Sequence, residues 1–370
     1  MGSKRAMLGN GLGDVLEDMV GRHRRFVDLF TGSASVAWHV AQRYPIATFA
    51  FDLQRYSAVL AAAVVQRNNP VNPVRLWNDW VRRATPKFEA FCAPDATVVN
   101  AAFVIKARKW ACQFDQTSLV HAYAGHYYSP VQACWIQALR DTVPTKSPNR
   151  EVCLAALVMA ASKCAASPGH TAQPFQPTDT AIKYLEISWH RNFCADVQAA
   201  LAQLAPIHAR VSGKSDVGDA NEIASQLQPG DLVFIDPPYS AVQYSRFYHV
   251  LEAIAVGATS PVFGVGRYPP LHERPSSKYS QKTTAKLAIQ DLLVTLAARE
   301  VSAIITFPDH ECSNGVDADM IKNYASEIFE ARTQIVSSVF STLGGPALSG
   351  QGPRLARLNA DEMILCLEPR

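Results

Sequence analysis

The chain lacks the features that would place it in a membrane or outside the cell. Its longest apolar stretches, such as residues 152–161, are far shorter than the roughly 20 residues that cross a bilayer. Residues 1–5 carry charges but no apolar run follows them, so we expect no secretory signal. The eight cysteines include no Cys-x-x-Cys pair. That pattern favours reduced thiols in the cytoplasm.

Common phosphate-binding motifs and a strong net charge are also missing. Neither Gly-x-Gly-x-x-Gly nor a complete Gly-x-x-x-x-Gly-Lys-Ser/Thr is present, so dinucleotide and triphosphate sites are poorly supported. The formal net charge is only +3, which permits nucleic-acid binding but requires any basic surface to be local. Asp309-His310 has no Gly-x-Ser-x-Gly elbow, which argues against a serine hydrolase. His121 and His126 have no Cys or acid at ligand spacing, so we expect no metal.

What is present begins with a repeated order of strand and helix. After a predicted helix over residues 9–20, the pattern predicts a buried strand, a loop of small residues and a helix, and then a second strand and helix. This order predicts a doubly wound α/β sheet. The five segments are 26–30, 31–35, 36–43, 48–52 and 56–65.

Strand-like segments then become scarce until about residue 211. Helices are predicted at 132–141, 151–164 and 195–204, so we interpret residues 70–205 as a mainly helical insertion and the probable target-recognition domain. The α/β domain is then discontinuous, over residues 1–69 and 206–370. Its later part is predicted to hold strands at 231–236 and 302–307 and a closing antiparallel pair at 335–340 and 362–367.

The most informative stretch is an apolar run that stops abruptly at Asp236-Pro237-Pro238-Tyr239. The run reads as a buried strand of a parallel sheet. A carboxylate at the carboxyl end of such a strand lies where open α/β sheets bind ligands. The two prolines fix φ and make the turn stiff. The acid, the Pro237 carbonyl and the Tyr239 ring therefore suit a pocket that grips a flat ring bearing an amine.

The loop after the first predicted strand is a second candidate site. Asp28, Phe30, Gly32 and Ser33 lead into the following helix, whose N-terminal N–H groups can face a ligand. Asp52 ends the next strand and is placed to accept hydrogen bonds from a ribose. Each feature also has an ordinary interpretation, as a packing turn and as a helix cap.

Phe30-Thr31-Gly32, Asp52 and Asp-Pro-Pro-Tyr, in this order, resemble the S-adenosylmethionine-dependent N6-adenine DNA methyltransferases of the Dam-like alpha group. Gly2-Ser3-Lys4-Arg5 is similar to the N-terminal motif of that group, whose lysine lies near the cofactor. Val217-Gly218-Asp219 is similar to its acid beside the adenine of the cofactor. Residues 243–252 resemble the branch of FokI-type modification methylases.

The resemblance implies a Rossmann-like methyltransferase fold and methyl transfer from S-adenosylmethionine to the N6 amine of a flipped-out adenine. The amine is a poor nucleophile because its lone pair is delocalised into the ring. Asp236 and the Pro237 carbonyl would each accept one N–H, and Tyr239 would stack on the base. The implied catalytic residues are Asp236, Pro237, Pro238 and Tyr239, and the implied cofactor contacts are Lys4, Asp28, Phe30, Gly32, Ser33, Asp52, Asp219 and Asp236.

The sequence departs from the family pattern Phe-x-Gly-x-Gly at Ala34, which takes the last glycine position. Because Ala is small, we expect the loop to survive unless that position requires a positive φ. Ser240-Ala241 also replaces the Asn and polar residue that relatives often have after the tetrapeptide.

Two groups of residues are candidates for contacts with double-stranded DNA, the implied substrate. An ordinary solvated surface is the alternative interpretation for the first group. The groups are Lys106, Arg108 and Lys109 in the insertion, and Gln243, Tyr244, Arg246 and Tyr248 after the catalytic turn.

The resemblance further implies the modification half of a restriction or related defence system, with a cognate component as partner, and neither a metal nor a membrane. Two alternatives remain open. The enzyme could methylate cytosine N4 or an RNA adenine, or the chain could be a catalytically silent DNA-binding subunit.

Overall fold

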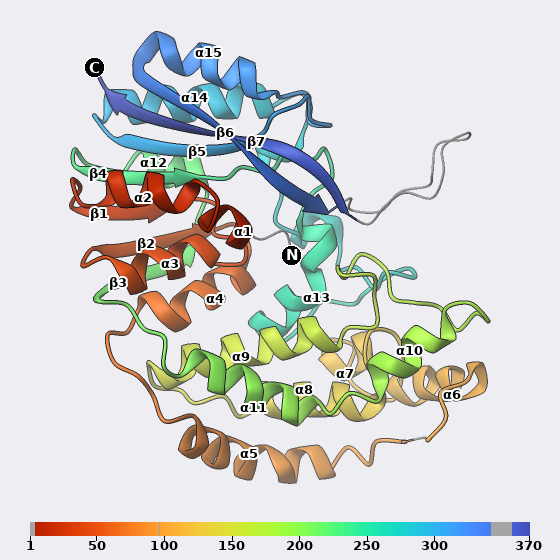
Figure 1. Cartoon of the computed structure of the whole chain (residues 1–370). Coiled ribbons are helices and arrows are strands. Elements are labelled where there is room, and N and C mark those ends of the chain that lie inside the picture. The colour runs from red at the N-terminus through yellow and green to blue at the C-terminus, as the bar shows by residue number, and fades with distance from the viewer. Residues whose placement is uncertain (1–3, 96, 342–356) are drawn as a thin grey trace. The chain divides into compact units, whose positions relative to one another are not determined.

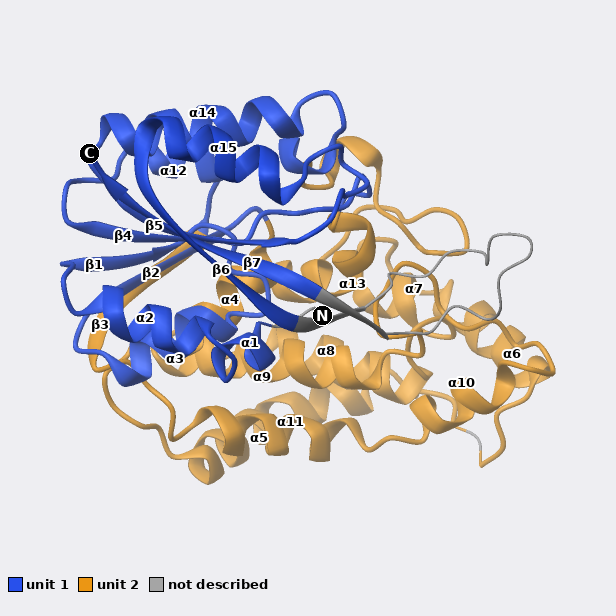
Figure 2. Cartoon of the chain, turned by 45° about the horizontal axis from the view of Figure 1, so that its top comes forward, with its two compact units in different colours: residues 1–53, 217–243, 277–370 blue, residues 54–216, 244–276 orange. Residues whose placement is uncertain are grey.

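The computed structural model describes residues 4–95, 97–341 and 357–370. Figure 1 shows their helices and strands, coloured along the chain. They form two compact units, which Figure 2 shows in two colours. Unit 1 comprises Met1–Leu53, Val217–Gln243 and Ser277–Arg370, and unit 2 comprises Gln54–Asp216 and Tyr244–Ser276. Gly2 and Ser3 of the N-terminal motif lie outside the described residues.

Unit 2 is larger than the predicted insertion. It contains residues 206–216 as well as all of residues 70–205, and it gains two further segments, which are α4 (Arg55–Val65) and residues 244–276 after the Asp-Pro-Pro-Tyr turn. Contacts between these two additions explain the difference, because Glu252 accepts hydrogen bonds from the backbone N–H groups of Arg55 and Tyr56, at 2.9 and 3.0 Å. A tertiary pairing of this kind leaves no boundary signal in the sequence.

The described residues form a seven-stranded sheet, in the order β3-β2-β1-β4-β5-β7-β6. The pairs β2-β1, β1-β4 and β4-β5 are parallel, whereas β5-β7 and β7-β6 are antiparallel. The predicted doubly wound sheet and closing antiparallel pair are confirmed. The strands are β1 (Arg25–Asp28), β2 (Ala47–Asp52), β3 (Val211–Val217), β4 (Asp231–Ile235), β5 (Ser302–Pro308), β6 (Phe329–Ser341) and β7 (Arg357–Pro369).

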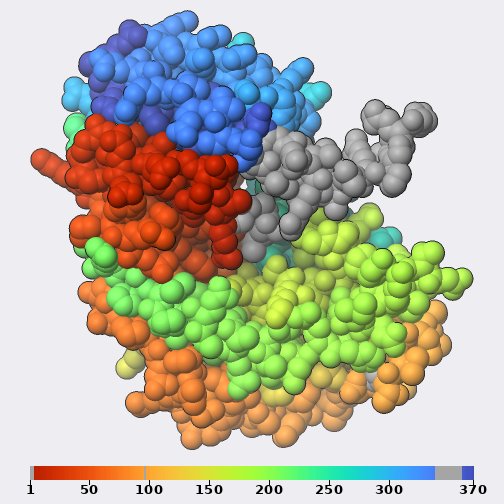
Figure 3. Space-filling model, viewed as in Figure 1, coloured from red at the N-terminus to blue at the C-terminus, as the bar shows by residue number. Residues whose placement is uncertain are grey.

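Helices cover both faces of the sheet in unit 1. Successive strand side chains point to opposite faces, so Phe26 and Phe234 join one apolar core while Val27 and Val233 join the other. The first core also holds the N-terminal helices, and on the face shown in Figure 3 the red N-terminal residues lie against the blue C-terminal ones. The helices are α1 (Arg5–Leu8), α2 (Leu12–Val20) and α3 (Ser35–Arg43) on one side, and α12 (Ala220–Ala224), α14 (Ala285–Ala298) and α15 (Ala318–Ile328) on the other.

Unit 2 is built from helices, most of which follow a side-chain cap. Asn72, Asn100, Ser118, Ser129 and Asn192 each accept a hydrogen bond from the first turn of the helix they precede. Three helices predicted from periodicity each begin two residues earlier than expected. The helices besides α4 are α5 (Pro73–Glu89), α6 (Ala101–Ala111), α7 (Leu119–Tyr123), α8 (Pro130–Asp141), α9 (Asn149–Cys164), α10 (Ile182–Trp189), α11 (Phe193–Leu204) and α13 (Ser245–Val256).

Among the described residues, no helix combines the length and the apolar character needed to cross a membrane.

Candidate active site

Asp236 follows the fully buried strand β4 and is held on one side of its carboxylate. Oδ1 accepts a hydrogen bond from the Thr306 hydroxyl at 3.0 Å and lies 3.1 Å from the Lys4 ammonium. Thr306 is adjacent because β4 and β5 pair in parallel, with Ile235 opposite Ile305. Within the described part of the chain no donor engages Oδ2, and the side chain is 26% exposed. One oxygen is therefore anchored, while the other has no hydrogen-bond donor among the described residues.

Lys4 bridges two carboxylates. It immediately precedes α1 and forms ion pairs with Asp236 and with Glu362 of β7. Burial lowers the pKa of Lys4, but the two carboxylates outweigh burial and raise it above its usual range. Burial likewise raises the pKa of Asp236, a change that Lys4 opposes and Glu362 reinforces. The net result is an Asp236 pKa above that of an ordinary aspartate.

The prolyl turn is held from the neighbouring loop. Asn314 is 1% exposed, and its amide donates hydrogen bonds to the carbonyls of Pro238 and Tyr279, both at 3.0 Å. The Ser313 hydroxyl accepts a hydrogen bond from Ala241 N–H at 3.0 Å. No described residue donates to the Pro237 carbonyl. The turn is thus fixed while the Pro237 carbonyl stays available as an acceptor.

Asp28 and Asp52 shape the loop after β1. Asp28 is 1% exposed and accepts a hydrogen bond from Phe30 N–H at 3.2 Å, whereas Asp52 accepts one from Gly32 N–H at 2.9 Å. Burial raises the pKa of Asp28 well above its usual range against the Phe30 N–H, and the charges of Asp236 and Asp52 add to that rise. Three carboxylates therefore gather at the carboxyl ends of the adjacent strands β2, β1 and β4.

Ala34, which takes the last glycine position of the family pattern, has a left-handed backbone conformation. Its φ is +62°, so this position does require the left-handed conformation. The loop adopts it at a cost of about 1–2 kcal/mol for an alanine.

Asp219 caps a helix. Its carboxylate accepts hydrogen bonds from Asn221 and Glu222 N–H at the start of α12, at 3.0 and 3.4 Å. Gly218 N–H donates to the Asp52 carbonyl at 3.0 Å. This contact brings the 217–219 motif beside the end of β2, and a role of Asp219 in cofactor binding stays a prediction.

The hydrogen-bond acceptors at this edge of the sheet fit the predicted cofactor. Carboxylates at the ends of β1 and β2 suit the hydroxyl and amino groups of a nucleoside and the positive charge of a sulfonium. The Phe30 ring, which meets Tyr279 edge-on at 4.9 Å, adds an apolar surface to the same loop.

The residues predicted to contact DNA differ in how much of each side chain is exposed. Lys106, Lys109 and Arg246 are exposed. Arg108 is half-buried and donates to the Gly125 carbonyl at 2.8 Å, and Tyr248 is 5% exposed and packs on Tyr56. Tyr244 is partly exposed, and Gln243, in unit 1, makes hydrogen bonds with both N–H and carbonyl of Ser277. Their contacts with DNA stay predictions.

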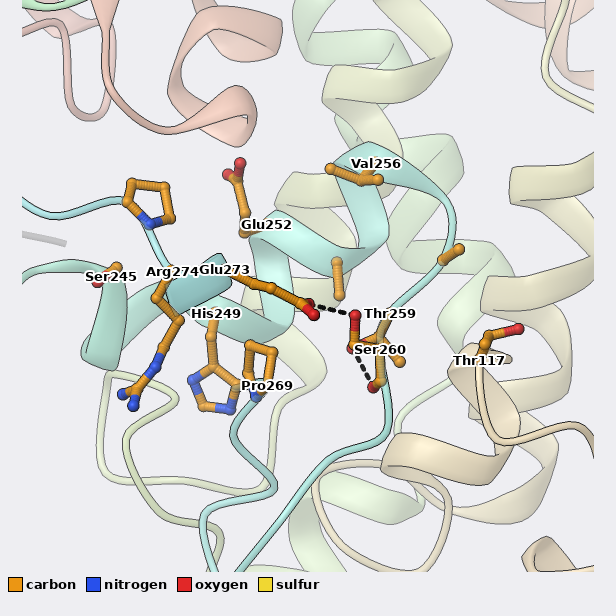
Figure 4. A pocket seen from close by; sticks show the side chains of 13 residues that line it. Thr117, Ser245, His249, Glu252, Val256, Thr259, Ser260, Pro269, Glu273 and Arg274 are labelled. Atoms are coloured by element: carbon orange, nitrogen blue, oxygen red, sulfur yellow. Dashed lines mark hydrogen bonds between the residues drawn. The ribbon is translucent and has the colours of Figure 1, made fainter. Parts of the chain in front are cut away.

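Unit 2 also contains a pocket of about 500 Å³ that sequence reasoning did not indicate (Figure 4). His249 of α13 forms part of its wall; it is 3% exposed, with ring nitrogens 2.8 and 3.2 Å from the carbonyls of Gly266 and Arg246. Burial lowers the pKa of His249 to about 4. His249 is therefore an interior residue, and Glu252 of the same helix caps α4.

Sequence reasoning missed Thr306, Asn314 and Glu362. Thr306 is a polar residue at the end of an otherwise apolar run, and Glu362 begins another, so both positions carried a weak signal. Asn314 lies in an irregular segment and carried none.

The sheet, and the acid and prolyl turn at the end of β4, define an α/β methyltransferase class. Residues 192–300, which include Asp219 and the Asp-Pro-Pro-Tyr turn, match the family described as D12 class N6 adenine-specific DNA methyltransferase. Over these residues the predicted resemblance to N6-adenine DNA methyltransferases is confirmed.

A named relative supports the same family. The chain is 44% identical over 75 residues to the modification methylase LlaI of Lactococcus lactis subsp. lactis. That match covers 20% of this chain and 11% of the relative.

Proposed function

We propose that the chain transfers a methyl group from S-adenosylmethionine to the N6 amine of an adenine in double-stranded DNA. The asymmetric anchoring of Asp236 carries this proposal. Lys4 and Thr306 hold Oδ1, so Oδ2 and the neighbouring Pro237 carbonyl remain as two acceptors for the two N–H groups of an amine.

Two acceptors change the reactivity of the amine. An N–H bonded to each would hold the nitrogen toward tetrahedral geometry, with its lone pair directed away from the two acceptors and toward the cofactor methyl group. S-adenosylmethionine, when bound, supplies the methyl group from its sulfonium. The nitrogen would lose one proton as it gains the methyl group, and Asp236 Oδ2 would receive that proton. The rate then comes mainly from positioning and electrostatics.

The cofactor would lie along the carboxyl ends of β1 and β2. We assign Asp28, Phe30, Gly32, Ser33 and Asp52 to it, with Asp219 near its adenine. Asp28 and Asp52 already order the loop that would receive it, through Phe30 and Gly32 N–H. We also assign Lys4, which pairs with Asp236, to cofactor binding.

The target base must leave the duplex to reach Asp236, at a cost of a few kcal/mol, and stacking on Tyr239 would offset part of it. Unit 2 would supply target recognition. Its exposed cations Lys106, Lys109 and Arg246 would contact phosphates. The proposal includes a cytoplasmic location, which the eight free cysteines favour, and a cognate restriction or defence component.

A direct test is incubation of the purified chain with labelled S-adenosylmethionine and duplex DNA of mixed sequence, followed by digestion to nucleosides. We expect N6-methyladenine, and a loss of at least about 100-fold in rate for Asp236→Asn. No methylated nucleoside across diverse sequences would refute the proposal. Label in cytosine N4, or only in RNA, would instead support the alternative substrates, and DNA binding without transfer would support a silent subunit.

A further inference from the structure

The C-terminal strand brings a second acid to the lysine that holds Asp236. Glu362 of β7 is 8% exposed, and its Oε2 pairs with Lys4 Nζ, whose other carboxylate partner is Asp236. A buried carboxylate is costly unless it is paired, so this contact ties the charge of β7 to the candidate active site.

We propose that Glu362 is a positioning residue for methyl transfer, which acts through Lys4 to orient Asp236 and to keep its carboxylate a strong acceptor. The proposal rests on the proposed function and deepens it. Neither the family match, which ends at residue 300, nor the Asp-Pro-Pro-Tyr motif includes this residue.

The strand register accounts for the placement. Thr306 and Pro308 lie two residues apart, on the same face of β5. Thr306 donates a hydrogen bond to Asp236, and Pro308 lies opposite Glu362 of β7. The contact Asp309 N–H to Asp361 carbonyl, at 2.9 Å, extends the pairing beyond the strand end. Two elements from the last third of the chain, β5 and β7, therefore fix the acid of β4.

Electrostatics gives Glu362 a role beyond anchoring. Lys4 carries one positive charge and faces two carboxylates, so the three groups together have a formal charge of −1 (+1 − 1 − 1). If Asp236 shared the ammonium with no other acid, its negative charge would be largely neutralised and it would accept an N–H less strongly. Because Glu362 also pairs with Lys4, less of the ammonium charge is available to neutralise Asp236.

The other titratable groups facing Asp236 have the same sign as Glu362. Asp28 of β1 interacts electrostatically with both Asp236 and Asp52. Among the described residues, Lys4 is the cation that pairs with Asp236. Burial and Glu362 thus raise the pKa of Asp236, whereas Lys4 and the Thr306 hydroxyl lower it.

This arrangement predicts opposite pH effects for two substitutions. Asp236 must be ionised to accept the amine proton, so activity falls as pH drops through its pKa. Removing the charge of Glu362 lowers the pKa of Asp236, whereas removing the charge of Lys4 raises it. The acidic limb of the kcat profile should therefore move to lower pH in Glu362→Gln and to higher pH in Lys4→Gln.

The experiment measures kcat and KM for DNA against pH in the wild type, Glu362→Gln, Lys4→Gln and the double variant. We expect Glu362→Gln to lower kcat about tenfold at neutral pH with little change in KM, since the change in acceptor strength acts on the transition state. Glu368→Gln is the matched control, because Glu368 lies on the same strand but pairs with Arg22 and Arg332. It should leave both constants unchanged.

Thermal unfolding and a carboxyl ¹³C NMR titration of Asp236, assigned by its loss in Asp236→Asn, separate folding from electrostatics. A wild-type enzyme that is active, with an acidic limb unmoved by Glu362→Gln, would overturn the role of Glu362 and leave the proposed function standing. An inactive wild type would overturn the proposed function instead. If Glu362→Gln fails to fold, Glu362→Asp must keep the limb while lowering kcat, or the proposal is wrong.

Discussion

In unit 1 buried carboxylates such as Asp28 and Glu362 lie on strands of the sheet, whereas in unit 2 buried or partly buried arginines bind backbone carbonyls. Within the described ranges, one carboxylate oxygen of Asp236 has no hydrogen-bond donor. Arg67 of unit 2, by contrast, is 4% exposed and donates to five carbonyl oxygens, those of Ala63, Asn69, Leu204, Ala205 and Ile207.

Other arginines of unit 2 follow the same pattern at helix ends. Arg140 donates to the last carbonyls of α13, and Arg267 donates to the carbonyls of His121 and Ala122 in α7. A cation at a helix C-terminus satisfies carbonyls that have no partner within the helix. The number of basic residues in unit 2 therefore overstates its capacity to contact DNA, because several guanidinium groups are already engaged.

The largest expected effect tests this contrast through Arg67. Arg67→Met should lower the free energy of unfolding by about 3–5 kcal/mol, because it leaves several buried carbonyls without donors. Chemical denaturation measures the change, with Arg75→Met, an exposed arginine of α5, as the control. An unchanged midpoint for Arg67→Met would mean that the buried arginines do not stabilise unit 2.

Thr306→Val tests the anchored oxygen of Asp236. Loss of a hydrogen bond to a charged group should lower kcat about 10- to 100-fold, since such bonds contribute about 1.5–3 kcal/mol. Methyl-transfer kinetics report the change, and Thr306→Ser, which keeps the hydroxyl, should restore most of the rate. Equal activity in Thr306→Val and the wild type would show that Oδ1 needs no anchor on β5.

A pair of neighbouring cations on α6 distinguishes exposed from engaged charge. Lys109→Gln should weaken DNA binding across all sequences and reduce the slope of log affinity against log salt by about 1, the effect of one lost phosphate contact. Arg108→Gln should instead lower the stability of unit 2, because Arg108 binds the Gly125 carbonyl. If the salt slope responds to Arg108 rather than to Lys109, the assignment of the two residues is reversed.

The smallest expected effect concerns the loop of unit 1. Ala34→Gly should raise the free energy of unfolding by about 0.5 kcal/mol, because relief of the left-handed alanine slightly exceeds the entropic cost of glycine. Ala37→Gly, within α3, should lower it by about 1 kcal/mol. Two changes of the same sign would indicate that backbone strain at position 34 is negligible.

The elements that carry the site could be read from local patterns. Apolar runs that end at Asp52 and Asp236 predict buried strands with acids at their carboxyl ends, because parallel strands are buried on both faces. The first strand was predicted to continue to residue 30, but β1 ends at Asp28. Proline at positions 237 and 238 stops β4 for a purely local reason. The helices α8, α9 and α11 could likewise be predicted, because apolar periodicity is a local property of the sequence.

By itself, then, the sequence determined the doubly wound sheet, the prolyl turn and the family resemblance, because each depends on residues close together in the chain. Tertiary structure alone decided that Lys4 lies between Asp236 and Glu362, since 358 positions separate Lys4 from Glu362. It also decided that α4 and residues 244–276 join unit 2, because that boundary depends on long-range contacts such as Glu252 with α4. Local pattern cannot encode either result, because packing selects among partners that are distant in sequence.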